Sequence, residues 1–252
     1  MGMTDRPLSG KAALVTGGSR GIGAATAHAL ASDGAAVAIS YSESAGRAGE
    51  VVSALEGMGG RAVALRADQG DPRQVAELVN RVAAEFGRLD ILINNAAVFA
   101  TGQVDDAEAD PATLDRQLAV NLGGVTAAIR AAALVLQDGG RIISVGSMQA
   151  TRTGYPGVAD YVATKAGIVG YSKGAARDLG PRGITVNVVQ PGSVATDMNP
   201  ANGAFADVQR AANAMGRFGT PEEIAAGIAF LAGPNASFIT GAVLDIDGGY
   251  LS

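Results

Sequence analysis

Residues 12–23 read AALVTGGSRGIG, and this stretch decides the fold class. Ala12–Thr16 is a short apolar run that predicts a strand, and a helical pattern follows over Gly21–Ser32. The glycines between them let the backbone turn tightly and approach a pyrophosphate. The helix would then point its free N–H groups at that anion. A turn that needs glycine only for its backbone conformation is the alternative, and the strand–turn–helix context favours the phosphate-binding interpretation.

Apolar runs alternate with helical stretches along the rest of the chain. Further strands are expected at 35–40, 61–66, 91–94, 141–145, 184–189 and 242–246, and further helices at 45–58, 72–86, 112–136, 161–179 and 222–231. This alternation predicts right-handed βαβ units, hence an α/β fold with a doubly wound parallel sheet of about seven strands and helices on both faces. No linker divides the chain, so we expect a single domain over 1–252. The least regular stretch, 192–219, is expected to be a mobile substrate loop.

Composition excludes several classes of protein. The 252 residues carry 19 Lys and Arg against 24 Asp and Glu, a formal charge of −5, which argues against nucleic acid as the main partner. The chain has no Cys and one His, so we expect no disulfide, no thiolate nucleophile and no metal site. No apolar run is long enough to span a membrane, and the N-terminus is unlike a signal peptide. We therefore expect a cytoplasmic protein.

Tyr161 and Lys165 lie four residues apart in a helical stretch, which places them on one helix face. A nearby ammonium favours the phenolate and would lower the tyrosine pKa from about 10 towards neutrality. A tyrosine tuned in this way can exchange a proton near neutral pH. In isolation, the same spacing would more often be a chance pair of surface residues.

These motifs arrive in an order that resembles the short-chain dehydrogenase/reductase family over nearly the whole chain. The matching pieces are Thr16–Gly23, Asp68, Asn94-Asn95-Ala96-Ala97, Asn121, Ser147, Tyr161 with Lys165, Pro191-Gly192 with Thr196, and Asp247-Gly248-Gly249. The pattern is most similar to the branch of 3-oxoacyl-acyl-carrier-protein reductases and ketoreductases. The resemblance implies a Rossmann-type sheet and a homotetramer. Ala97 departs from the family, which usually has glycine there.

The resemblance also implies a catalytic set of four residues: Asn121, Ser147, Tyr161 and Lys165. Tyr161 would be the proton donor in ketone reduction, and Ser147 would bind the carbonyl oxygen. Lys165 would bind the nicotinamide ribose and lower the tyrosine pKa, and Asn121 would hold a water linking Lys165 to solvent. Ser144 is the alternative to Ser147, but it falls inside the expected strand.

The cofactor is expected to be NADP(H) rather than NAD(H). The second strand ends at Ser40-Tyr41-Ser42, with no carboxylate before Glu43 to bind a ribose 2′-hydroxyl, and the Arg20 guanidinium could bind a 2′-phosphate. Asp68 would accept from the adenine amine, and Asn94 would lie beside the adenosine ribose. The full set of expected cofactor contacts is Gly17, Ser19, Arg20, Gly21, Ile22, Gly23, Ser40, Tyr41, Ser42, Asp68, Gln69, Asn94, Ala96, Tyr161, Lys165, Pro191, Gly192, Val194 and Thr196.

The expected substrate pocket is mostly apolar. Its predicted residues are Phe99, Met148, Gln149, Tyr155, Met198 and Phe205. An apolar pocket suits a hydrophobic ketone, so we expect NADPH-dependent reduction of small-molecule ketones or β-keto esters, reversible as alcohol oxidation. The alternative is 3-oxoacyl-acyl-carrier-protein reduction, with acyl carrier protein as a partner. A third hypothesis is a non-catalytic dinucleotide-binding protein, since fold alone does not establish function.

Overall fold

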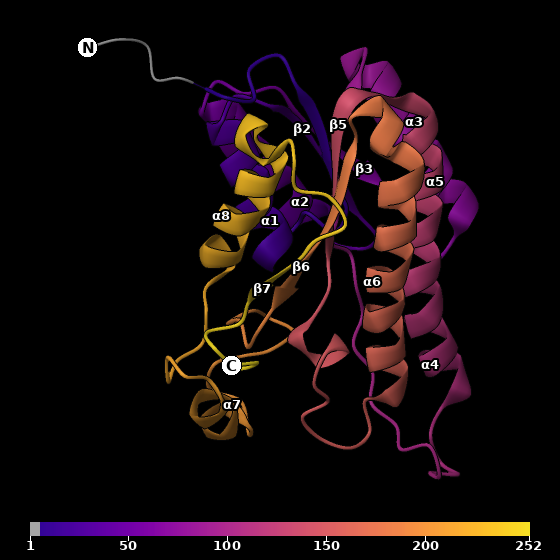
Figure 1. Cartoon of the computed structure of the whole chain (residues 1–252), viewed down its shortest axis with the longest axis vertical. Helices are drawn as coiled ribbons and strands as arrows, with labels where there is room; N and C mark the ends of the chain where they lie inside the picture. The colour runs from indigo at the N-terminus through magenta and orange to yellow at the C-terminus, as the bar shows by residue number, and fades with distance from the viewer. Residues whose placement is uncertain (1–5) are drawn as a thin grey trace.

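Seven parallel strands form one sheet in the order β3-β2-β1-β4-β5-β6-β7 (Figure 1). The computed structural model describes residues 6–252. The strands are β1 (Ala12–Val15), β2 (Ala36–Tyr41), β3 (Ala62–Arg66), β4 (Leu89–Asn94), β5 (Leu136–Val145), β6 (Thr185–Pro191) and β7 (Val243–Ile246). The order reverses between β1 and β4, and in such sheets ligands bind at the carboxyl ends beside this switch point. The predicted doubly wound fold is confirmed.

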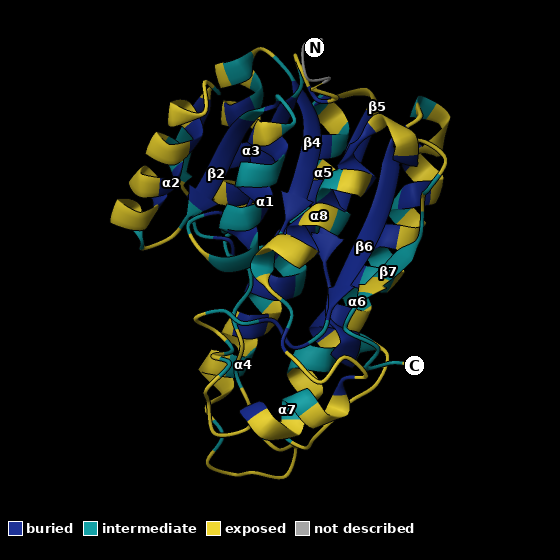
Figure 2. Cartoon of the chain, turned by 90° about the vertical axis from the view of Figure 1, so that its left-hand side faces the viewer, coloured by how far each residue is buried: buried dark blue, intermediate teal, exposed yellow. Residues whose placement is uncertain are grey.

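Helices cover both faces of the sheet (Figure 1). One face carries α1 (Gly21–Ser32), α2 (Ala45–Gly57) and α8 (Pro221–Ala232), and the other carries α3 (Pro72–Phe86), α5 (Gly124–Val135) and α6 (Ala159–Leu179). The central strands between them are buried on both sides, whereas the edge strands β3 and β7 are only partly buried (Figure 2). In β1, for example, Ala13 and Val15 belong to the core under α1 and α8, whereas Leu14 belongs to the core under α3 and α5. This explains why the strand is apolar throughout instead of alternating.

Local sequence signals set several helix starts. The Asp71 carboxylate accepts from the backbone N–H of Arg73 at 2.9 Å and caps α3, with Pro72 in its first turn. The start of α8 has a complete capping box, in which Thr220 and Glu223 exchange side-chain and backbone hydrogen bonds. These caps fix the ends of helices that run back from the sheet edge where the site lies.

The long helix expected over 112–136 is interrupted. Helix α4 (Pro111–Leu118) passes through a π-helical turn, Ala119–Gly123, before α5 begins, and β5 starts at Leu136 instead of 141. The continuous stretch Pro111–Val135 is long and apolar enough to cross a membrane by length and composition alone. Its side chains Val125 and Ile129 are instead buried in the core against α3 and the sheet.

The segment 192–219 is more regular than its sequence predicts. It contains α7 (Ala206–Ala212), an isolated parallel bridge between Val194 and Gly219, and a tight turn in which Thr196 and Asn199 pair. Helix α7 lies beyond the carboxyl end of the sheet, away from both helical layers (Figure 1). The expectation of an irregular loop was wrong for residues 206–212, and the mobility of the segment remains a prediction.

Candidate active site

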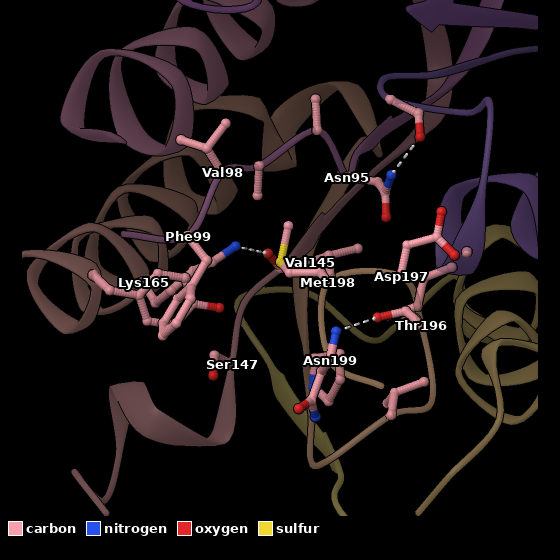
Figure 3. A pocket seen from close by; sticks show the side chains of 18 of the residues that line it. Asn95, Val98, Phe99, Val145, Ser147, Lys165, Thr196, Asp197, Met198 and Asn199 are labelled. Atoms are coloured by element: carbon pink, nitrogen blue, oxygen red, sulfur yellow. Dashed lines mark hydrogen bonds between the residues drawn. The ribbon is translucent and has the colours of Figure 1, made fainter. Parts of the chain in front are cut away.

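A cavity of about 630 Å³ opens at the carboxyl ends of the strands (Figure 3). Its walls come from segments far apart in sequence: the glycine-rich turn after β1, the end of β2, residues 95–99 after β4, the end of β5, the start of α6, residues 191–199 and helix α7. Parallel strands deliver all their carboxyl ends to one edge, which is why these segments meet there.

The glycine-rich turn is held close to the end of β4. Gly17 has φ of 63°, and a Cβ there would lie 2.8 Å from the Cα of Ala96. The Asn95 amide donates to the carbonyl oxygens of Thr16 at 2.9 Å and Gly17 at 3.0 Å. A Cβ at Gly23 would lie 2.4 Å from the Gly17 carbonyl oxygen, so Gly23 lets the helix pack under the turn. The turn is thereby fixed with its backbone facing the cavity.

Tyr161 and Lys165 both line the cavity from the first turns of α6. Lys165 is buried, its Nζ donates to the Val145 carbonyl oxygen at 2.9 Å, and burial lowers its pKa to about 8 (Figure 3). Burial raises the pKa of Tyr161 to about 12, against a smaller lowering by the Ser147 hydroxyl. The prediction that Lys165 brings the tyrosine pKa towards neutrality is not met by the chain alone, because loss of water around the phenolate is the largest influence on this pKa.

Ser147 lies at the cavity wall just after β5. Its Oγ accepts from the Gln149 backbone N–H at 3.2 Å and caps a short 3₁₀ turn, Met148–Ala150. Ser144, the alternative, is fully buried within β5 and accepts from the Asn94 amide at 3.2 Å. Only Ser147 of the two faces the cavity.

Asn121 is buried in the π-helical turn and does not line the cavity. Its Oδ1 accepts from the Val98 N–H, and its Nδ2 donates to the Val98 carbonyl oxygen, both at 2.9 Å. Nδ2 also lies 3.4 Å from the Thr164 hydroxyl, next to Lys165 on α6. Asn121 therefore ties the segment after β4 to the helix that carries the tyrosine and lysine.

Most of the predicted cofactor contacts meet in the cavity. The lining residues among them are Gly17, Ser19, Arg20, Gly21, Ile22, Ser40, Tyr41, Ser42, Gln69, Ala96, Tyr161, Lys165, Pro191, Gly192, Val194 and Thr196. Gly23 packs beneath the turn instead. A Cβ at Gly192 would lie 2.6 Å from the backbone of Asp247, so the tail motif Asp247-Gly248-Gly249 lies directly behind this wall.

Asp68 and Asn94 lie outside the cavity lining. The Asp68 carboxylate pairs with the Arg116 guanidinium and accepts from the Gly70 N–H at 2.8 Å, and these contacts lower its pKa. Asn94 is buried between β4 and β5 through its bond to Ser144, and its neighbour Asn95 lines the cavity. The roles predicted for Asp68 at adenine and for Asn94 at the ribose stay predictions.

All but one of the predicted substrate residues line the cavity. Phe99, Met148, Gln149, Tyr155 and Met198 line the cavity, whereas Phe205 is 73% exposed and lies outside it. The Phe99 and Tyr161 rings meet edge to face with centroids 4.9 Å apart. The Gln149 amide donates to the Tyr155 hydroxyl at 3.1 Å.

Sequence reasoning missed part of the wall. The missed lining residues include Asn95, Arg116, Asp197, Asn199, Val208, Gln209, Ala212 and Tyr250. Three of them come from α7, whose helical pattern ADVQRAA is only seven residues long and was passed over. Tyr250 comes from the C-terminal tail, where no local signal points to the cavity. Within residues 6–252, no group of three His, Cys, Asp or Glu side chains could hold a metal ion.

The fold and the site together are those of an oxidoreductase of the doubly wound α/β class. A family model described as enoyl-(acyl carrier protein) reductase matches residues 17–251. The chain belongs to the short-chain dehydrogenase/reductase family.

Three known proteins illustrate how similar this chain is to other members of the family. A short-chain dehydrogenase from Burkholderia cenocepacia, solved in complex with NADP, is 52% identical with a TM-score of 0.95, covering 98% of this chain and 100% of that one. A cyclic-di-GMP-binding biofilm dispersal mediator protein from Escherichia coli is 41% identical over 243 residues, 96% of this chain and 98% of its own. A 3-oxoacyl-[acyl-carrier-protein] reductase from Synechocystis is 39% identical over 250 residues, 96% of this chain and 97% of its own.

Proposed function

We propose that this protein is an NADPH-dependent carbonyl reductase that converts ketones or β-keto esters to secondary alcohols, reversible as an alcohol dehydrogenase. The observation that carries the proposal is the convergence of Ser147, Tyr161 and Lys165 on one wall of a cavity that continues to the glycine-rich turn. A dinucleotide sensor would not need these three side chains together, whereas proton transfer to a carbonyl does.

Each of these residues would have its own role in carbonyl reduction. Bound NADPH would supply the hydride. Tyr161, whose pKa of about 12 keeps it protonated at neutral pH, would donate its phenolic proton to the carbonyl oxygen as negative charge develops there. Ser147 would donate a hydrogen bond to the same oxygen. Lys165 would bind the ribose hydroxyls, and Asn121 holds the adjoining segments in register through Val98.

The cavity fits a phosphorylated dinucleotide. Gly17 leaves room for a close approach that a Cβ would close, and the Gln69 side-chain amide nitrogen is buried without a partner among the described residues. Arg20 lines the same end of the cavity as Ser42, and β2 itself carries no carboxylate. These features favour NADP(H) over NAD(H), and the NADP complex of the Burkholderia relative supports the same choice.

The other end of the cavity favours a hydrophobic substrate. Its wall is formed largely by Phe99, Met148, Tyr155, Met198 and Val208. The polar side chains Gln149, Asn199 and Gln209 also line the cavity. We propose a free ketone or β-keto ester as the substrate class.

Two alternatives have support of their own. Reduction of 3-oxoacyl groups on acyl carrier protein is supported by the name of the Synechocystis relative. The net charge of −5 argues against an acidic protein partner, because such partners are steered by a basic surface. A non-catalytic nucleotide-binding role is the remaining alternative, and the name of the Escherichia coli relative gives it some support.

The same proposal includes a homotetramer in the cytoplasm. Its support is the edge position of β7 and the exposed aromatic side chains near it, Phe230 and Phe238. Paired edges and covered apolar faces are the usual way in which such sheets avoid aggregation.

A panel of ketones and β-keto esters, followed by NADPH absorbance, tests the proposal. We expect turnover of at least one apolar ketone or ester, with the alcohol as product. Tight NADPH binding without turnover of any carbonyl compound, including an acyl-carrier-protein substrate, would instead favour the non-catalytic alternative.

A further inference from the structure

The substrate end of the cavity contains a second tyrosine, Tyr155, besides Tyr161. The Gln149 Nε2 donates to the Tyr155 hydroxyl oxygen at 3.1 Å. This bond uses a lone pair of the phenol oxygen, and within residues 6–252 the proton of the same hydroxyl has no acceptor. Tyr155 is 47% exposed, so a substrate can reach it. The hydroxyl therefore has a hydrogen bond to donate to a bound molecule.

Gln149 connects this phenol to the serine of the site. Its backbone N–H donates to the Ser147 Oγ at 3.2 Å, and its side chain donates to Tyr155. Gln149 is only 8% exposed, and its Oε1 is buried without a partner among the described residues. A buried polar atom without a partner destabilises the folded state, and a methionine of similar size would avoid that cost. The bond that holds Tyr155 explains the amide better than packing does.

The segment that carries Tyr155, between the 3₁₀ turn and α6, is fixed at both of its ends. At the first end, the Gln190 amide donates to the Thr151 hydroxyl at 3.1 Å. At the second, the Gly102 N–H donates to the Gly157 carbonyl oxygen at 2.9 Å. Because both ends are fixed, Tyr155 is presented to the cavity from a segment with little freedom to move away.

Tyr155 also lies near the reacting end of the cavity. Burial is the largest cause of the raised pKa of Tyr161, which is about 12, and the charge of Tyr155 adds a smaller rise. Such an influence weakens with distance, so the two phenols lie near each other. Ser147, Tyr155 and Tyr161 line the same cavity, and one small substrate can therefore meet all three hydroxyl groups.

We propose that the Tyr155 hydroxyl, oriented by Gln149, donates a hydrogen bond to a second oxygen atom of the substrate while Ser147 and Tyr161 bind the reacting carbonyl. This inference rests on the proposed carbonyl reduction and narrows its substrates to ketones with a second acceptor oxygen, such as β-keto esters. A ketone without that oxygen leaves the phenol proton unpaired in the complex, which disfavours it. The apolar wall cannot make this distinction, because a carbonyl group and a methylene group fill similar space.

Two substrates of matched length test the role of Tyr155. Ethyl acetoacetate and 2-heptanone have chains of the same length, and 2-heptanone has methylene groups in place of the ester carbonyl and the ester oxygen. The ratio of their kcat/KM values with NADPH is measured for the wild type, for Tyr155→Phe and for the control Tyr171→Phe. Tyr171 packs against Arg130 on α6, away from the cavity. Comparing ratios between proteins cancels the different intrinsic reactivity of the two compounds.

Tyr155→Phe should lower the ester-to-ketone ratio by about three- to tenfold, the effect of one lost hydrogen bond between neutral groups. Tyr171→Phe should leave the ratio within about 1.5-fold of the wild type, since it removes a hydroxyl far from the substrate. An unchanged ratio in Tyr155→Phe, or an equal fall in the control, overturns the proposal. Acetoacetyl-acyl-carrier-protein has the same second carbonyl as a thioester and should lose as much as the free ester. A loss confined to the carrier substrate would assign Tyr155 to carrier binding and overturn its role at the second oxygen.

A double-mutant cycle tests the positioning role of Gln149. Gln149→Met keeps the size of the side chain but cannot donate to Tyr155, so the ester-to-ketone ratio should fall by about two- to threefold. The double variant with Tyr155→Phe should have the same ratio as Tyr155→Phe alone, because Gln149 acts through the phenol. If the two losses multiply in the double variant, Gln149 acts independently and its positioning role is overturned.

Binding to the protein loaded with oxidised NADP provides a measurement that does not depend on turnover. Oxidised NADP has no hydride to transfer, so calorimetry can measure the affinity of both compounds. Tyr155→Phe should weaken ethyl acetoacetate by about three- to tenfold relative to 2-heptanone. If this difference appears but no carbonyl compound is reduced, only the proposed reduction is contradicted. If both compounds are reduced and Tyr155→Phe weakens them equally, only the role of Tyr155 is overturned.

Discussion

The Nζ of Lys165 lies 5.7 Å from the centroid of the Tyr161 ring, one turn away on α6. Both side chains line the same cavity, and burial there moves their two pKa values towards the neutral forms, to about 8 for the lysine and about 12 for the tyrosine. The amine is meanwhile held by the Val145 carbonyl oxygen. The pair therefore starts from a protonated phenol, which is the form that a proton donor needs.

The lowered lysine pKa makes a prediction about stability. Below about pH 8 Lys165 is protonated in both the folded and the unfolded chain, and the folded state bears the full cost of a buried charge. Between about pH 8 and 10.5 the folded chain has lost this proton while the unfolded chain still holds it, so the contribution of this group to stability rises with pH. The free energy of unfolding of the wild type, relative to Lys165→Met, should rise on the order of 1–3 kcal/mol over this window. Denaturant unfolding at fixed protein concentration measures it, and parallel pH curves for the two proteins would contradict the lowered pKa.

Removing the phenolic hydroxyl should remove turnover and leave binding intact. We expect Tyr161→Phe to lower kcat by about 10²–10⁴-fold, the usual contribution of a positioned proton donor. NADPH affinity should change less than about twofold, as judged by a fluorescence titration. Tyr171→Phe is the control on the same helix, since Tyr171 packs against Arg130 away from the cavity. More than about a tenth of the wild-type rate in Tyr161→Phe would refute its role as proton donor.

Arg20 should set the preference between the two nicotinamide cofactors. Its loss removes a charge-assisted hydrogen bond, worth about 1.5–3 kcal/mol, that only the 2′-phosphate can accept. Arg20→Ala should therefore lower kcat/KM for NADPH by about tenfold or more and leave the NADH value within about threefold. Arg73→Ala, on the exposed start of α3, is the matched control. Equal wild-type values of kcat/KM for NADPH and NADH would sink the proposed preference.

Features that depend on residues close together in the sequence could be predicted, and features that depend on distant residues could not. The order of strands and helices could be predicted, because β1 and its neighbours are apolar on both faces and the helices carry caps such as Asp71 and Thr220. Ser147, Tyr161 and Lys165 could be selected because each belongs to a short motif. The pair between Asp68 and Arg116 joins residues 48 positions apart, and no local pattern marks it.

Burial explains the remaining differences. The raised tyrosine pKa depends on water being excluded by segments from across the chain, which the spacing of Tyr161 and Lys165 does not report. The wall formed by α7 was missed because the helix is short and lies between glycine- and asparagine-rich turns. The π-helical turn that interrupts the long helix at Asn121 also involves tertiary contacts. The Asn121 side-chain amide binds both the N–H and the carbonyl oxygen of Val98, which no other backbone group among the described residues pairs in a regular way.

The protein should assemble as a homotetramer. Strand β7 has β6 as its only neighbour within the described sheet, and Phe238 just before it is fully exposed, at 101%. Covering this side would bury Phe238 together with Phe230 of α8, which is 51% exposed. Light scattering of the wild type should give four times the monomer mass, and Phe238→Ser should shift the distribution towards smaller species. A monomeric wild type at micromolar concentration would contradict the proposed assembly.

The preference for a free β-keto ester over an acyl-carrier-protein substrate can be tested with two reductions run side by side. An acyl carrier protein is strongly acidic and needs a basic surface to guide it. Residues 131–140, which form the end of α5 and the first half of β5, carry no lysine or arginine. Arg130 stacks on Tyr171 with its Cζ 5.8 Å from the ring centroid. Arg152 is held by the ring and carbonyl oxygen of Tyr250, at 5.3 and 3.4 Å.

The two arginines that line the cavity, Arg20 and Arg116, are themselves paired with Asp197 and Asp68, whereas the apolar wall of the cavity needs no charged partner. We therefore expect kcat/KM for a simple β-keto ester to equal or exceed that for acetoacetyl-acyl-carrier-protein, with the carrier value falling further as salt is added. Arg152→Ala should change the ester reaction less than about twofold, because the ester does not depend on steering by charge. The carrier substrate could instead be preferred by more than about a hundredfold, which corresponds to about 2.7 kcal/mol of transition-state binding. Only specific contacts with the carrier could supply that difference, so this result would make acyl-carrier-protein reductase the better description of the protein.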